Sequence, residues 1–259
     1  MASLAIIQAR MGSTRLPGKV LMPLISKPVL WHVINQVRKA RHVDTLIVAT
    51  TTCPEDDTIE ARCREWGVLC FRGDPLDVLK RFHDTVRSPL NDHRVFDYVI
   101  RITADCPLID PDIIDRIVRE ARKGGYDYVS NTDPPTFPDG LDVEVFTPKS
   151  LETAHLSATL MSDREHVTPF IRRDPQNRKM NVSCEEDLSY LRWTLDTRED
   201  YAFLTGVYDN LLGEEGTFSY RDVLSIIEKK PELLSINNMF HRNEGYEKSL
   251  LEDKKKTGS

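Results

Sequence analysis

Short apolar runs rich in β-branched residues alternate with amphipathic helical patterns along most of this chain. Such alternation is typical of an α/β protein built on a largely parallel sheet, because parallel strands need crossover connections, usually helices. The expected strands are Leu4–Ala9, Thr45–Thr51, Val68–Phe71, Asp97–Thr103, Tyr126–Ser130, Leu141–Phe146, Lys179–Cys184 and Tyr190–Leu195. The expected helices are one that begins near Pro28 and others over Glu55–Trp66, Pro75–Val86, Pro111–Arg122, Pro148–Leu160, Arg164–Arg172, Glu199–Leu212 and Tyr220–Lys229.

No change of composition, Pro/Ser-rich linker or internal repeat divides the chain. We therefore expect a single α/β domain over residues 1–248, with a mostly parallel central sheet flanked by helices. Residues 249–259 are rich in charged side chains, and we expect them to form a flexible C-terminal tail.

The distribution of charge points to an anionic small molecule rather than to nucleic acid. The chain carries 35 Lys and Arg against 41 Asp and Glu, a formal net charge of −6. A surface that holds nucleic acid by counterion release needs an excess of basic residues, so we expect no nucleic-acid partner. Residues 1–43 nevertheless contain basic residues and no acidic one, which predicts an anion site near the N-terminus. The basic residues are Arg10, Arg15, Lys19, Lys27, Arg38, Lys39 and Arg41.

Cysteine usage and hydropathy favour a cytoplasmic protein. The five cysteines are odd in number and form no C-x-x-C motif, which indicates neither a zinc site nor a disulfide framework. The N-terminal residues lack the apolar core of a signal peptide, and no stretch approaches the length of a membrane span. We therefore expect no membrane association.

The segment Arg10–Lys19 connects the first expected strand to its helix, at the edge where open α/β sheets bind ligands. Gly12 and Gly18 allow the backbone to approach a ligand, and three cations can neutralise phosphates. The spacing of the glycines excludes a Walker A loop, and Val20 stands where that loop has Ser or Thr. From the residues alone, the segment is either a phosphate-binding loop or a solvated basic loop with turn glycines.

Two carboxylates follow expected strands without being needed as helix caps. The helix after Asp105 has its own cap in Asp110, and Thr197 with Asp200 makes a capping-box start after Asp196. Two spare carboxylates at strand ends suit Mg²⁺, which retains waters and substrate phosphates as its other ligands.

Three further patterns lie in the second half of the chain. The alternation in 141–146 places Asp142 and Glu144 on one strand face, where they either bind sugar hydroxyls or meet water. Asn131 and Thr132 follow another strand, in a position that also suits an ordinary turn. In the segment 164–166, Glu165 suits a helix start, and a histidine such as His166 is more often structural or solvated than catalytic.

Several segments resemble the CMP-sugar synthetases, the cytidylyltransferases that activate KDO and acylneuraminates, and most of all their spore-coat-polysaccharide branch. The segments are IQARMGSTRLPGKVL (7–21), Gly73-Asp74, DVLKR (77–81), RITADCPLID (101–110), FPDGLDVEVF (137–146), REHVTPFI (164–171) and LDTRED (195–200). The resemblance implies a GT-A-like nucleotidyltransferase fold, CTP as donor, Mg²⁺ as cofactor, pyrophosphate as product and a homodimer. The KDO branch usually has a glycine before the first metal-binding Asp where this chain has Ala104, so the assignment of residues follows the spore-coat branch.

The resemblance also implies roles for individual residues. Nucleotide binding falls to Ala9, Arg10, Met11, Gly12, Ser13, Arg15, Lys19, Asp74, Arg81, Thr103 and Ala104. Arg10, Lys19 and Asp105 are the expected catalytic residues, and Asp105 and Asp196 the expected metal ligands. Acceptor binding falls to Asn131, Thr132, Asp139, Asp142, Glu144, Arg164 and His166.

The expected reaction is attack by an acceptor oxygen on the α-phosphorus of CTP. The acceptor is an acidic sugar or a related small molecule. Two alternatives remain open. One is an acceptor that attacks through its own phosphate or phosphonate oxygen, and the other is a GT-A glycosyltransferase that uses a nucleotide sugar.

Overall fold

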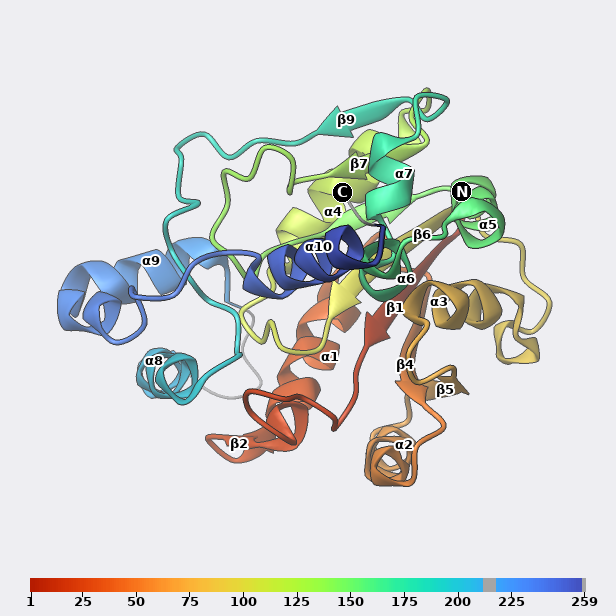
Figure 1. Ribbon diagram of the computed structural model, residues 1–259. Coiled ribbons are helices and arrows are strands. Elements are labelled where there is room, and N and C mark those ends of the chain that lie inside the picture. The colour runs from red at the N-terminus through yellow and green to blue at the C-terminus, as the bar shows by residue number, and fades with distance from the viewer. Residues whose placement is uncertain (212–217, 258–259) are drawn as a thin grey trace.

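The computed structural model describes residues 1–211 and 218–257 (Figure 1). Its strands are β1 (Ser3–Gln8), β2 (Pro23–Leu24), β3 (Lys27–Pro28), β4 (Thr45–Thr51), β5 (Leu69–Gly73), β6 (Tyr98–Thr103), β7 (Tyr128–Ser130), β8 (Glu144–Phe146) and β9 (Lys179–Asn181). Its α-helices are α1 (Val29–Lys39), α2 (Asp57–Glu65), α3 (Val78–Arg87), α4 (Pro111–Arg122), α5 (Pro148–Ser157), α6 (Met161–His166), α7 (Pro169–Arg173), α8 (Arg198–Tyr208), α9 (Tyr220–Lys229) and α10 (Glu244–Thr257). Short 3-10 helices cover Lys19–Leu21, Pro54–Asp56, Pro89–Asn91 and Pro231–Ser235. Over the described residues, no helix is both long and apolar enough to cross a membrane.

The central sheet has the strand order β5-β4-β1-β6-β8-β7-β9. β1 pairs in parallel with β4 and β6, and β4 pairs in parallel with β5. β8 runs antiparallel to both of its neighbours, β6 and β7, whereas β7 and β9 are parallel to each other. The predicted α/β class with a mostly parallel sheet is therefore confirmed.

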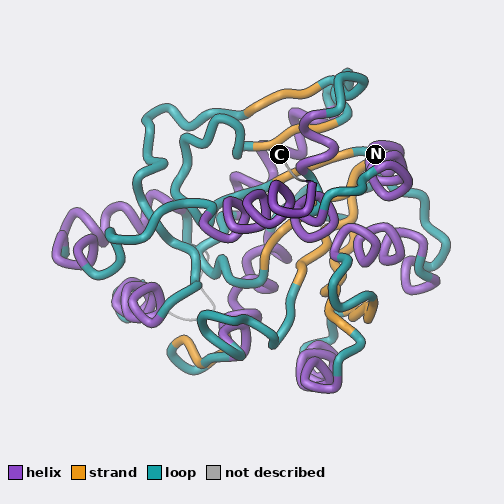
Figure 2. The backbone as a smooth tube through the Cα atoms, viewed as in Figure 1, coloured by secondary structure: helices purple, strands orange, loops and turns teal. Residues whose placement is uncertain are grey.

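Helices cover both faces of this sheet (Figure 2), because the inner strands are apolar on both faces. Ala5 and Ile7 of β1 face a core formed with α1, α2, α4, α8 and α9. Leu4 and Ile6, which alternate with them, face a second core formed with α3, α5 and α7. The period of two along β1 thus fixes which helices pack on which face.

The predicted caps of two helices are confirmed. Asp110 accepts a hydrogen bond from the backbone N–H of Asp112 at the start of α4. Thr197 and Asp200 form a capping box at the start of α8. Asp105 and Asp196 are therefore not the caps of these two helices, and their side chains can serve another role.

Two predicted elements are wrong. Residues 190–195 form no strand, and the segment makes only an isolated bridge between Arg192 and Asp139. Leu191, Trp193 and Leu195 are buried there, but Arg192 and Thr194 are buried as well, so the alternation in the sequence does not correspond to a buried and an exposed face. The single helix expected over 164–172 is two helices, α6 and α7, because Val167 has a left-handed φ of 70°.

The C-terminal segment also differs from the prediction. Residues 249–257 belong to helix α10 rather than to a flexible tail, and Ser249 and Asp253 are buried. α10 packs beside α6 across the middle of the molecule (Figure 1, dark blue). The expected end of another helix at Leu212 lies outside the described residues, since α8 ends at Tyr208 and the description resumes at 218.

Candidate active site

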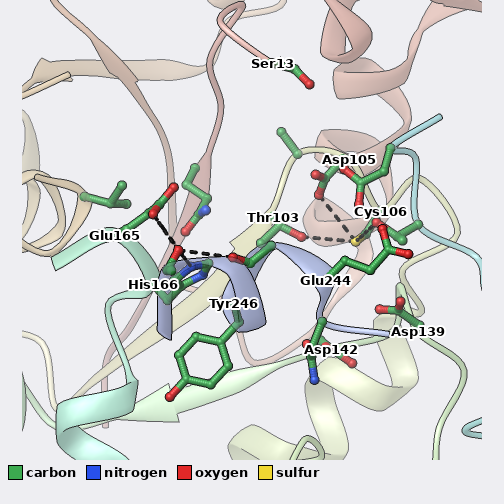
Figure 3. A pocket seen from close by; sticks show the side chains of 18 of the residues that line it. Ser13, Thr103, Asp105, Cys106, Asp139, Asp142, Glu165, His166, Glu244 and Tyr246 are labelled. Carbon is green, nitrogen blue, oxygen red and sulfur yellow. Dashed lines mark hydrogen bonds and ion pairs between the residues drawn. The ribbon is translucent and has the colours of Figure 1, made fainter. Parts of the chain in front are cut away.

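A cavity of about 720 Å³ opens beside the carboxyl ends of β1 and β6. Its walls come from the first loop, the segment after β6, β8, α6, α7 and α10. Figure 3 shows Glu165 and His166 on one side of the cavity and Asp105 on the other, with Glu244 and Tyr246 on the ribbon of α10. The cavity therefore joins segments from both ends of the chain.

The first loop is folded on itself, although several of its side chains are exposed. The backbone N–H groups of Ser13 and Gly18 both donate to the carbonyl of Met11, at 2.8 and 2.9 Å. Gly18 has a φ of 72°, a conformation that glycine adopts without strain. Asp56 accepts from the backbone N–H of Met11 at 2.7 Å and anchors the loop to the chain that follows β4.

Most, but not all, of the predicted nucleotide-binding residues line the cavity. Met11 and Gly12 form the loop backbone and do not line the cavity. Those that line the cavity are Ala9, Arg10, Ser13, Arg15, Lys19, Arg81, Thr103 and Ala104. The loop thus brings its cations to one wall.

Lys19 joins the two predicted metal ligands. Its Nζ lies 2.5 Å from Asp105 Oδ2 and 2.7 Å from Asp196 Oδ1, and it also donates to the carbonyl of Leu195 at 2.8 Å. Burial opposes the charge of this ammonium, but the two carboxylates outweigh that effect and raise the pKa of Lys19. Two carboxylates from distant segments therefore converge on one cation.

This pair fits the ligand requirements of Mg²⁺. In residues 1–211 and 218–257, no group of three or more His, Cys, Asp or Glu side chains could hold a metal ion. Mg²⁺, however, is usually held by one or two carboxylates, with waters and substrate phosphates completing its shell. Because Asp105 and Asp196 already bracket a positive charge, they have the spacing and oxygen chemistry for such an ion.

Arg81 and Arg10 form a second focus of positive charge. Arg81 is 2% exposed, and its Nη1 donates to the carbonyl of Asp74 at 2.8 Å. Its Nε is buried without a hydrogen-bond partner among the described residues. Burial, with the nearby charge of Arg10, lowers the pKa of Arg81 to about 10. Two neighbouring guanidinium groups at a cavity wall favour an anion.

Asp74, a predicted nucleotide-binding residue, lies outside the cavity lining. Its Oδ1 accepts from the backbone N–H groups of Leu76 and Asp77, at 2.9 and 3.0 Å. Asp74 therefore shapes the turn before α3, and its carbonyl holds Arg81.

The acidic residues predicted on the acceptor side line the cavity in pairs with arginines. Glu144 pairs with Arg101, and Tyr128 donates to its other oxygen at 2.5 Å. Asp142 pairs with Arg242.

Asp139, the third of these acids, lies 3.4 Å from a guanidinium nitrogen of Arg192. Burial, with the neighbouring charge of Asp142, raises the pKa of Asp139 to about 7. The acids on this wall are thus held in fixed positions, and Thr132 lies among them.

Two predicted acceptor-binding residues do not reach the cavity. Asn131 is fully buried, where its side chain donates to the carbonyl of Leu141 and accepts from the N–H of Val143. Arg164 pairs with Asp77, the N-cap residue of α3, and donates to the carbonyl of His155 at 2.8 Å. Both side chains therefore have structural partners.

His166 does line the cavity. Its Nε2 lies 3.0 Å from Ser249 Oγ, which in turn donates to Glu165 at 2.8 Å. Burial, with the nearby charge of Arg101, lowers the pKa of His166 to about 4, so this imidazole is neutral at pH 7.

Several lining residues were not predicted from the sequence. Arg101 lies within the otherwise mostly apolar strand β6, and Arg172 lies within the short helix α7. The others come from the segment before α8 and from the C-terminal segment, where no recognisable motif marks them. These are Arg192, Arg242, Glu244, Tyr246, Lys248 and Ser249.

Comparison with known proteins agrees with this geometry. Residues 4–235 match the family described as Cytidylyltransferase. The chain belongs to the cytidylyltransferase family. The resemblance seen in the sequence is therefore confirmed, and the protein is a CTP-dependent nucleotidyltransferase.

Individual relatives of this cytidylyltransferase extend over most of its length. It is 32% identical over 237 residues to the spore coat polysaccharide biosynthesis protein SpsF of Bacillus subtilis. The matched residues make up 88% of this chain and 95% of SpsF. A solved cytidylyltransferase of Leptospira borgpetersenii is 33% identical, with a TM-score of 0.84, and covers 93% of this chain and 100% of its own.

A third relative matches only part of the cytidylyltransferase. The 8-amino-3,8-dideoxy-manno-octulosonate cytidylyltransferase of Shewanella frigidimarina is 36% identical over 116 residues, which is 44% of each chain. The likeness to this relative is thus confined to less than half of the protein.

Proposed function

We propose that this enzyme transfers CMP from CTP to an acidic sugar or a related acceptor and releases pyrophosphate, as a step in the synthesis of precursors for surface polysaccharides or glycoconjugates. The observation that carries the proposal is the convergence of Asp105 and Asp196 on Lys19, next to a wall of arginines. Phosphoryl transfer depends on this combination of cations and metal-binding carboxylates more than on a covalent protein partner.

The triphosphate would lie along the wall formed by Arg10, Arg15 and Arg81. Arg81 supports this placement, because a buried guanidinium without a carboxylate partner gains most from an anionic ligand. Lys19 would share its ammonium between the carboxylates and a phosphate oxygen.

Asp105 and Asp196 would hold Mg²⁺, which supplies neutralisation of the charge on the phosphate oxygens. Both carboxylates are held by neighbouring cations. Asp105 is partly exposed and accepts from Lys19. Asp196 also accepts from Lys19 and lies 2.7 Å from a guanidinium nitrogen of Arg15.

The acceptor would enter from the wall that carries Asp139, Asp142 and Glu144. An oxygen of the acceptor attacks the α-phosphorus, and the bond to the bridging oxygen breaks as pyrophosphate leaves. Each of the three acids contacts an arginine, so this wall presents oriented oxygens to sugar hydroxyls.

The proposal is tested by measuring thermal stabilisation of the purified protein by CTP, ATP, GTP, UTP and CMP-sugars, each with and without Mg²⁺. Pyrophosphate release is then measured with CTP and a panel of acidic sugars and sugar phosphates. We expect selective, Mg²⁺-dependent stabilisation by CTP, followed by pyrophosphate release with an acidic acceptor. Stabilisation by a nucleotide sugar alone would contradict the proposal and favour a glycosyltransferase.

A further inference from the structure

Arg172 is an arginine on the acceptor side of the cavity that forms no ion pair with a carboxylate of the described residues. Arg172 lies on α7 and lines the cavity, and its Nε is buried without a hydrogen-bond partner. Across residues 1–211 and 218–257, no ion pair joins Arg172 to a carboxylate, whereas Arg101, Arg192 and Arg242 on the same cavity are each paired. A guanidinium that no carboxylate pairs with keeps its N–H donors available for an anionic ligand.

Arg172 shares a carboxylate with another arginine. Burial opposes the charge of Arg172, but Glu144 outweighs that effect and raises the pKa of Arg172. This carboxylate already pairs with Arg101 and accepts from Tyr128. His166, on the same wall, adds no positive charge at pH 7, because burial lowers its pKa to about 4. One carboxylate therefore faces two guanidinium groups.

Helix α10 holds this part of the cavity in place. The ring of Tyr246 lies 5.6 Å from the guanidinium carbon of Arg172, a cation–π distance, and packs edge-on against His166 with ring centroids 5.2 Å apart. The carboxylate of Asp253 accepts from the backbone N–H groups of Met161 and Ser162 at the start of α6. α10 is thus anchored to the helices that it covers.

α10 also lies beyond the part of the chain that defines the family. The family match ends at residue 235, and α10 begins at Glu244. The nucleotide side of the cavity, with Lys19, Arg81 and Asp105, lies inside the matched region. Glu244, the first residue of α10, pairs with Arg15 of the first loop. Further along α10, Tyr246 contacts Arg172 and Ser249 contacts His166, so this part of the helix lies on the acceptor side of the cavity.

We infer that Arg172 and Tyr246 form an anion subsite that selects an acceptor carrying a negative group, and that α10 serves as a wall of the acceptor site. This inference rests on the proposed function. The guanidinium binds the anion through charge-assisted hydrogen bonds, and the tyrosine ring keeps the guanidinium plane directed into the cavity. A carboxylate and a phosphate share the chemistry that Arg172 recognises.

The experiment compares anionic acceptors with neutral counterparts. The anionic probes are 3-deoxy-manno-octulosonate, a carboxylate, and ribitol 5-phosphate, a phosphate; mannose and ribitol are the neutral probes. Binding is measured by calorimetry in the presence of CTP and Mg²⁺, and turnover by pyrophosphate release. We expect one anionic probe to bind and its neutral counterpart not to bind, and the anion that binds identifies the class of acceptor.

The Arg172→Gln variant should raise the KM for that anionic probe by roughly tenfold or more, with a smaller change in kcat. Tyr246→Leu should raise the same KM several-fold, since the guanidinium loses its supporting ring. The Kd for CTP should stay within about twofold of the wild-type value in both variants, which also shows that they are folded. Arg119→Gln, a change on the exposed face of α4, is the matched control and should alter neither constant.

Three outcomes would overturn the inference. They are preferential binding of the neutral probes, an unchanged KM in Arg172→Gln, and binding of CTP without binding of either anionic probe. A wild-type protein that fails to bind CTP would instead contradict the proposed function, so the two failures are distinguishable.

Discussion

Arg15 and Glu244 form an ion pair 2.6 Å long, although 229 positions separate them in the sequence. The same guanidinium lies 2.7 Å from Asp196. A triphosphate that binds Arg15 must therefore compete with two carboxylates, one from the first residue of α10 and one from the proposed metal site. The pair connects the first loop to helix α10.

Replacing Glu244 by Gln should increase the affinity for CTP. The variant loses a competing charge, and because both partners are more than one third exposed, the expected gain is modest, about twofold to fivefold in Kd. The measurement is calorimetric titration with CTP and Mg²⁺. Glu247→Gln, an exposed change in the same helical turn, serves as the control and should leave the Kd unchanged. Weaker binding by Glu244→Gln would show that Glu244 supports the nucleotide instead of competing with it.

Asn in place of either Asp105 or Asp196 should lower turnover by roughly a hundredfold or more, because each variant loses one of two proposed metal ligands. Pyrophosphate release should be measured over a range of Mg²⁺ concentrations, and we expect half-saturation to shift to higher concentrations. The exposed change Asp209→Asn is the matched control. Near-normal turnover in both site variants would refute the metal role.

The parallel core of the fold could be predicted because its strands are buried on both faces. β1 and β4 appear in the sequence as largely apolar runs, and β6 as such a run interrupted by Arg101. The segment 190–195 alternates apolar and polar residues and is not a strand, and its polar residues Arg192 and Thr194 are buried as well. Alternation in the sequence therefore does not record whether the backbone finds a neighbouring strand.

Helix α10 escaped prediction for a different physical reason. Its sequence is mostly charged, so it lacks the apolar face by which a surface helix is recognised. Its position instead depends on polar contacts that only the folded chain provides, such as those of Ser249 with Glu165 and of Asp253 with α6. For the same reason the sequence did not reveal Tyr246 or Glu244 as part of the cavity.

Conversely, the sequence motifs predicted two side chains in the site that instead contact structural partners outside the cavity. Arg164 and Asn131 stand in segments that resemble the family, but their partners, Asp77 and the backbone around Leu141, come from distant or following segments. A motif shows that a segment belongs to the site, and only the packing shows which of its side chains face the ligand.

His166 should make the protein less stable as the pH falls. The pKa of about 4 in the folded protein lies below the ordinary value of 6.5, so the unfolded chain binds a proton in this window that the folded protein does not. Between pH 7 and pH 5 the free energy of unfolding should therefore fall, with His166 contributing about 1–2 kcal/mol after allowance for its partial exposure.

The His166→Gln variant removes that contribution and should lose less stability over the same interval, as measured by urea unfolding at each pH. His241→Gln, at an exposed position, is the control and should follow the wild-type pH dependence. Parallel curves for wild type and His166→Gln would show that the imidazole is not held neutral by burial.

Gly140 fixes the spacing of the acidic wall, and its replacement by Ala should be strongly destabilising. Its φ is 114°, and an added Cβ would lie 2.7 Å from the backbone carbon of Trp193. We expect a loss of about 3 kcal/mol or more in the free energy of unfolding, because strained backbone and a clash with main chain combine. Turnover should also fall, since Asp139 and Asp142 flank this turn.

Gly124→Ala is the matched control. Gly124 also has a positive φ, 85°, but an added Cβ would meet nothing within 4 Å. The loss in the free energy of unfolding should therefore be about 1 kcal/mol. Equal losses in denaturant unfolding would mean that backbone conformation alone, and not the close approach to Trp193, requires glycine at position 140.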